Sequence, residues 1–145
     1  MTQAPPPDGG THEILQRNGP IFASLVGLTA LAILLQAVFA GEFIQRGTHS
    51  SWRSAHDVNA DVVVGLTVLT AVFALVRLRA AARSLAIGAV VLAVAVIVQV
   101  VIGHAITQSN DDGLVVVHVP LAMLIFALTI WLSVRARTLR RSSSR

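Results

Sequence analysis

Four long apolar stretches dominate this sequence and limit what the chain can fold into. They cover residues 21–40, 56–76, 84–106 and 114–134, and only short polar segments separate them. An α-helix rises about 1.5 Å per residue, so each stretch is long enough to cross about 30 Å of hydrocarbon. Short connections join antiparallel neighbours. The sequence therefore predicts an all-α integral membrane protein, folded as a four-helix up-down transmembrane bundle.

The composition agrees with a membrane protein and excludes several kinds of site. Hydrophobic residues make up 54% of the chain, and the mean hydropathy is +0.74, outside the range of soluble globular domains. The pI near 11.6 reflects arginines that flank apolar segments, so no nucleic-acid partner is expected. The chain has no Cys. Disulfides, iron–sulfur clusters and covalent haem attachment are therefore excluded.

The arginines predict how the chain is oriented. The connection between the second and third apolar stretches holds three of them, and the C-terminal segment holds five. The positive-inside rule then places both termini in the cytoplasm of a bacterial-type inner (cell) membrane. We expect residues 1–19 to form a disordered cytoplasmic tail, residues 20–135 the multi-pass transmembrane domain, and residues 136–145 a basic cytoplasmic tail. Cleavage of the first apolar stretch as a signal peptide is not expected, because the leader is long and lacks a compact positive region.

One pattern of polar residues occurs twice within the apolar sequence. Each copy consists of a Gln in an apolar helix, a small residue four places later, an outer connection, and then His-x-x-x-Ala. The offset between the two Gln residues is 63 and that between the two His residues is 62. The pattern predicts that the bundle is built from two two-helix repeats. The matching pairs are Gln36 and Gln99, Ala40 and Gly103, His56 and His118, and Ala60 and Ala122.

The repeated histidines are candidate ligands of one haem iron. His56 and His118 begin helices that run in the same direction, and these helices lie on a diagonal of the bundle. A haem iron binds two imidazoles on opposite faces of its macrocycle, which diagonal helices can supply. Gly41 and Gly103 would let a bulky ring approach the helix backbone. Because covalent attachment is excluded, the haem would be held non-covalently. The simpler alternative is that both histidines are polar residues at a polar boundary.

Other polar residues have assignments that depend on this site. Arg46 and Arg53 lie at the outer rim, where they could pair with haem propionates. Gln36 and Gln99 would either orient the ligands or bond to each other across the bundle. His104 is a weaker alternative iron ligand, and a side chain that reaches for the membrane boundary is the competing interpretation.

The repeated pattern resembles one half of the heme A synthase family over about residues 20–135. That family has eight spans in two four-helix halves, with a His on the second and fourth helix of each half. The resemblance implies the four-helix fold and makes His56 and His118 the ligand pair of one b-type haem. It does not extend to activity: Arg53 stands where the family has an acidic residue, and the outer Cys pair and the second half are absent. Haem A synthesis is not predicted.

We therefore expect a small membrane protein that binds one b-type haem near its outer face, with a role in electron transfer, haem handling or support of a respiratory complex. The alternative is a cofactor-free scaffold or assembly subunit of a larger membrane complex. A third interpretation is a quinone- or proton-handling enzyme that uses Asp57 or Asp61, which could equally mark a wet helix end. The expected partners are the lipid bilayer and either a second copy of the chain or respiratory-complex subunits.

Overall fold

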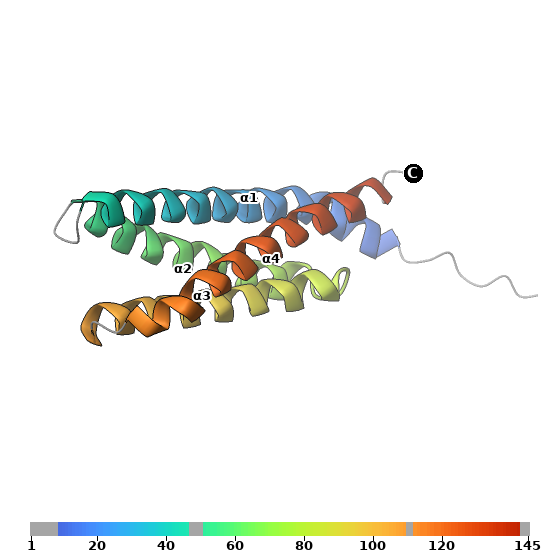
Figure 1. Cartoon of the computed structure of the whole chain (residues 1–145). Coiled ribbons are helices and arrows are strands. Elements are labelled where there is room, and N and C mark those ends of the chain that lie inside the picture. Colours follow the sequence, from blue (N-terminus) through green and yellow to red (C-terminus); the bar gives the residue numbers. More distant parts are fainter. Residues whose placement is uncertain (1–8, 47–50, 110–111, 143–145) are drawn as a thin grey trace, which may run out of the picture.

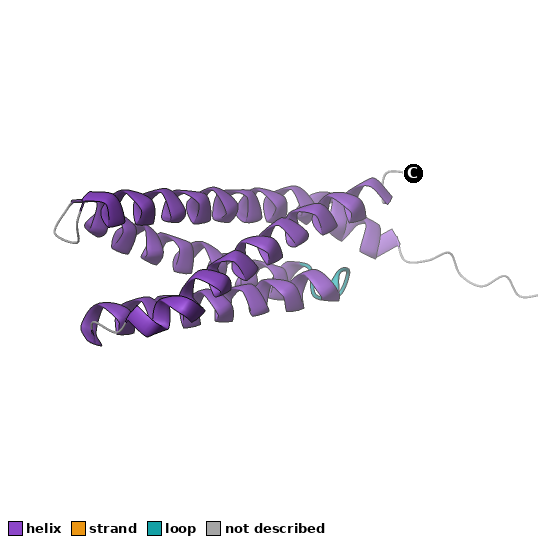
Figure 2. Cartoon of the chain, in the orientation of Figure 1, coloured by secondary structure: helices purple, strands orange, loops and turns teal. Residues whose placement is uncertain are grey.

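Four long helices make up the protein (Figures 1 and 2). In a computed structural model, which describes residues 9–46, 51–109 and 112–142, they are α1 (Gly9–Arg46), α2 (Ser51–Arg77), α3 (Arg83–Ser109) and α4 (Val115–Ser142). A short 3₁₀ helix, η1 (Asp112–Leu114), precedes α4. All four long helices are apolar enough and long enough to cross a membrane. The prediction of an all-α, multi-pass membrane protein is confirmed.

The helices form a ring in which each packs against its neighbours in the chain. α1 packs on α2, α2 on α3, and α3 on α4, and α4 closes the ring on α1. Within the described residues, α1 and α3 do not approach each other closely, and neither do α2 and α4, so these pairs are the diagonals. Successive helices run in opposite directions (Figure 1). This is the up-down bundle that the short connections predict.

The ends of two helices differ from the prediction. α1 begins at Gly9, so the prediction of a disordered segment is wrong for residues 9–19, while residues 1–8 lie outside the described part. The reason is tertiary packing: Leu15 and Asn18 are buried, and the Asn18 Oδ1 accepts a 3.3 Å hydrogen bond from Nε of Arg77. α4 likewise runs on as a helix to Ser142, through most of the predicted basic tail.

Buried side chains are unevenly distributed along the bundle. We call the end that holds His56 and His118 the histidine end, and the opposite end, where α2 and α4 finish, the arginine end. In the described part of the chain, every buried side chain lies in the middle or toward the arginine end, and the histidine end has none. The buried segments are 15–32 in α1, 59–74 in α2, 85–96 in α3 and 125–136 in α4.

Buried threonines add polar groups to this core without leaving them unpaired. The hydroxyls of Thr29, Thr67, Thr70 and Thr129 each donate to a backbone carbonyl one turn earlier in the same helix, at 2.7–2.9 Å. In a bilayer no water can satisfy such groups, so bonding within the helix lets threonine fill a small core position at little cost.

Candidate functional site

His56 lies in the second turn of α2 and is held against α1 through its imidazole. Its Nδ1 lies 3.2 Å from the backbone oxygen of Gln36, and its ring meets the edge of Phe43 at a centroid distance of 5.2 Å. A carbonyl oxygen only accepts, so Nδ1 carries the proton of this hydrogen bond and the neutral ring keeps a free lone pair on Nε2. Metal-binding histidines are typically held in this way. Nε2 is therefore the atom through which His56 could bind a metal.

A buried amide next to His56 joins α1 to α2. Nδ2 of Asn59 donates to the backbone oxygen of Ala32 at 2.9 Å and to Oε1 of Gln36 at 2.6 Å. Sequence reasoning did not single out this residue. Its position three residues after His56, on the same helix face, is the signal that could have found it.

Replacing Asn59 by leucine should loosen this junction. The change removes both hydrogen bonds and leaves Oε1 of Gln36 unpaired, so we expect the free energy of unfolding to fall by about 0.5–2 kcal/mol. Denaturation in detergent, followed by circular dichroism, would measure it. Thr29→Val is the matched control, because it removes a hydrogen bond within one helix and should cost less. Equal losses in the two variants would show that Asn59 does not join the helices.

In the α3–α4 hairpin, as in the α1–α2 hairpin, a Gln on the first helix bonds to a His on the second, but different atoms are involved. Nε2 of Gln99 donates to the backbone oxygen of His118 at 2.9 Å. A Cβ added to Gly103 would lie 3.2 Å from Cε1 of His118, so the absence of a side chain lets the imidazole pack directly on α3. The ring that lies against Gly103 is the imidazole of His118, and the approach of a haem ring to this position stays a prediction.

Two polar atoms at this contact are buried without a partner: Oε1 of Gln99 and Nδ1 of His118. In the first hairpin, Asn59 satisfies the corresponding oxygen of Gln36. The position 62 residues after Asn59 is Leu121, which cannot donate. Leaving a buried polar atom unpaired costs about 1–3 kcal/mol. Such a pair is therefore a place where a ligand, or a small shift on ligand binding, would supply hydrogen bonds.

The two histidines lie on diagonal helices at the same end of the bundle. His56 and His118 are partly buried and lie within electrostatic range of each other, although α2 and α4 are not neighbours in the ring. Figure 1 shows the α1–α2 hairpin and the α3–α4 hairpin separating toward this end. The histidine end also lacks fully buried side chains among the described residues. The two imidazoles are therefore candidate ligands of one shared group.

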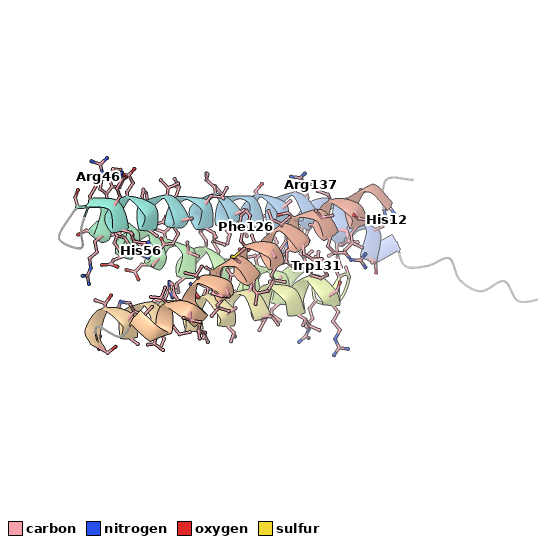
Figure 3. The ribbon with its side chains drawn as sticks, in the orientation of Figure 1. His12, Arg46, His56, Phe126, Trp131 and Arg137 are labelled. Atoms are coloured by element: carbon pink, nitrogen blue, oxygen red, sulfur yellow. The ribbon has the colours of Figure 1, made fainter. Side chains whose placement is uncertain are left out.

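The predicted rim arginines are both paired with acids on their own helices. Nε of Arg46 lies 2.6 Å from Oε2 of Glu42, and Nε of Arg53 lies 3.9 Å from Oδ2 of Asp57. Figure 3 shows Arg46 and His56 at the same end of the bundle. Because exposed pairs of this kind contribute at most about 1 kcal/mol, either arginine could be recruited by a stronger anion.

Four further predicted residues differ in their surroundings. Gly41 is exposed, and a Cβ there would meet nothing within 4 Å, so none of the described side chains packs against α1 at that point. His104 is exposed on α3 and its Nδ1 lies 3.0 Å from the backbone oxygen of Val100; it does not face His56 or His118. Gln36 and Gln99 bond to separate partners, so the prediction that they bond to each other is wrong.

The donor set suits a macrocycle better than a bare metal ion. Within the described ranges, no three side chains of the His, Cys, Asp or Glu type are grouped where they could hold a metal. A haem brings four nitrogens of its own and needs only two axial ligands. His56 and His118, on diagonal helices at one end of the bundle, would supply those two ligands, and the neutral ring of His56 keeps a lone pair on Nε2 for this purpose.

Comparisons with protein-family models, with curated proteins and with solved structures find no match for this chain. A functional assignment therefore depends on the geometry of its own side chains.

Proposed function

We propose that this protein binds one non-covalent b-type haem at the histidine end of the bundle, between His56 and His118. The observation that carries the proposal is that these two partly buried imidazoles, on diagonal helices, lie within electrostatic range of each other, at the end of the bundle that no fully buried side chain closes. A bound haem would supply one-electron chemistry to the membrane. Electron transfer, haem handling and support of a respiratory complex are the roles that this chemistry allows.

Each nearby side chain has a distinct part in the proposed site. The backbone oxygen of Gln36 fixes the tautomer of His56, so that Nε2 is the atom offered to iron. At the second histidine, Oε1 of Gln99 is the unpaired acceptor that could take the proton of Nδ1 and give His118 the same tautomer. Arg46 and Arg53 lie at the rim and would balance the charge of the propionates.

The proposed orientation places the histidine end at the outer face of the cell membrane. The described arginines other than the two rim residues lie toward the opposite end of the bundle, and the positive-inside rule assigns such an end to the cytoplasm. Both termini would then be cytoplasmic. These arginines are Arg17, Arg77, Arg79, Arg83, Arg135 and Arg137.

Purification in a mild detergent, followed by a dithionite-reduced minus oxidised spectrum, tests the proposal. We expect the absorption bands of a six-coordinate b-type haem, with a pyridine haemochrome assay giving one haem per chain. A protein that stays colourless after expression with added haem precursor, and that does not take up haemin, would contradict it.

A cofactor-free scaffold is the second candidate, and the hydrogen bonds between helices favour it. Gln36 and Gln99 each bond to the neighbouring helix, as residues that only join helices would. This function predicts that the double variant H56A/H118A associates normally with its partners, whereas Gln36→Leu impairs association. Haem in the purified protein, lost together with function in H56A/H118A, would exclude it.

A further inference from the structure

Asp61 lies near the middle of the bundle's length, as measured along α1. The bond from Asn59 to the backbone oxygen of Ala32 sets the level of the two helices, so Asp61 is about level with Ala30. That point is near the middle of the segment of α1 between Arg17 and Glu42, which contains no charged residue. At 1.5 Å per residue it is about 20 Å from Arg17 and about 18 Å from Glu42. Asp61 is therefore at hydrocarbon depth.

At this depth the carboxyl group points away from the bundle. Asp61 is exposed, and no ion pair or hydrogen bond joins its side chain to any other part of the described chain. Exposed valines and leucines need no explanation in a helix that faces lipid. An ionisable group there is costly, and in membrane proteins such groups almost always face protein or pair with another polar group. Something other than lipid must cover Asp61.

His104, on the next helix of the ring, offers the complementary group at the same depth. It is exposed, and its ring folds back over the preceding turn, with Nδ1 3.0 Å from the backbone oxygen of Val100. α2 ends at Arg77 and α3 begins at Arg83. Residues equally far from this turn are level with each other. Asp61 is 16 residues before Arg77 and Val100 is 17 residues after Arg83, so the ring of His104, which lies against Val100, is at about the level of Asp61.

We propose that the exposed face formed by α2 and α3 is the interface of a two-fold symmetric homodimer, in which Asp61 of each protomer pairs with His104 of the other. A two-fold axis along the membrane normal sets α2 of one copy against α3 of its partner and keeps every residue at its own depth. The pair then occurs twice, with one proton held between each carboxyl and imidazole. The proposed homodimer does not depend on the proposed haem.

Cross-linking tests whether α2 of one copy lies against α3 of the other. Because the chain has no Cys, only the introduced cysteines can form disulfides. Val72 on α2 and Ile87 on α3 are about half exposed and nearly equidistant from the α2–α3 turn. Two copies with different affinity tags, one carrying Val72→Cys and the other Ile87→Cys, should form a mixed disulfide dimer on mild oxidation in liposomes. Leu28→Cys on α1 with Leu124→Cys on α4, exposed positions on a different side of the ring, is the control pair and should not cross-link.

The polar pair is tested by energy transfer between labelled copies at several protein-to-lipid ratios. Asp61→Ala and His104→Ala should each weaken association by about 8-fold, because each removes two symmetric contacts of about 3-fold apiece. Both side chains are exposed in the protomer, so the helix content measured by circular dichroism should not change. The exchanged double variant D61H/H104D should recover much of the association.

Four outcomes would overturn the homodimer. They are a monomer at all ratios, a mixed disulfide only at the α1–α4 control pair, a disulfide only between two Val72→Cys copies, and unchanged association in Asp61→Ala. A monomer would mean that a different membrane protein covers Asp61. None of these outcomes bears on the haem spectrum, so the two proposals fail separately.

Discussion

Replacing His118 by alanine should abolish the b-type absorption of the purified protein, and replacing His56 should do the same. Each change removes one of the two proposed ligands, so that the haem would be held by a single imidazole and only weakly. We expect haem content to fall at least 10-fold, as measured by the pyridine haemochrome assay. Residual haem, if retained, should show a high-spin spectrum.

His104→Ala is the matched control for this pair. It removes the same side chain from the same end of the bundle, but from an exposed position whose ring contacts its own helix. Its spectrum should equal that of the parent. If His104→Ala loses haem while His118→Ala keeps it, the ligand assignment is wrong, and the weaker alternative of His104 as ligand gains support.

Replacing Gly88 by leucine should destabilise the packing of α3 on α4. A Cβ at this position would lie 2.9 Å from Cδ2 of Leu132 and 3.1 Å from Cζ3 of Trp131. Leu132 is fully buried, so it cannot turn away without disturbing its neighbours. Overpacking of this kind typically costs about 1–3 kcal/mol, occasionally more. Thermal or SDS denaturation in detergent, followed by circular dichroism, would measure the loss.

Gly27→Leu supplies the comparison for Gly88→Leu. Gly27 also sits in an apolar helix, but a Cβ there would meet nothing within 4 Å, so the substitution should be neutral or slightly stabilising. If the two variants melt at the same temperature, α3 and α4 do not pack as closely at Gly88 as described.

The fold followed from the sequence because apolar length and short connections leave few arrangements. The ends of the helices did not, since they depend on contacts between distant segments. α1 extends back to Gly9 because Leu15 and Asn18 find partners in the bundle, and no local pattern at residues 9–19 announces that.

The candidate site was predictable in its residues but not in its hydrogen bonds. The repeat singled out His56 and His118, and the structure brings them within electrostatic range. The repeat did not reveal that Asn59 donates a hydrogen bond to Gln36, or that Leu121 leaves Gln99 with an unpaired oxygen. These differences arise at positions where the two copies diverge, so a comparison of what they share could not find them. Whether the chain arose from two repeats stays a prediction.

The uneven core has a consequence for how the protein can change shape. Segments with few buried contacts open at a small cost in free energy, while a packed core opens only near the cost of global unfolding. Side chains of the arginine end hold all four helices together, so the helix ends that carry His56 and His118 can move apart without breaking that core. A large planar molecule could be admitted from the membrane and released again while the protein remains folded. Once bound, it would supply the packing that the polypeptide leaves out at that end.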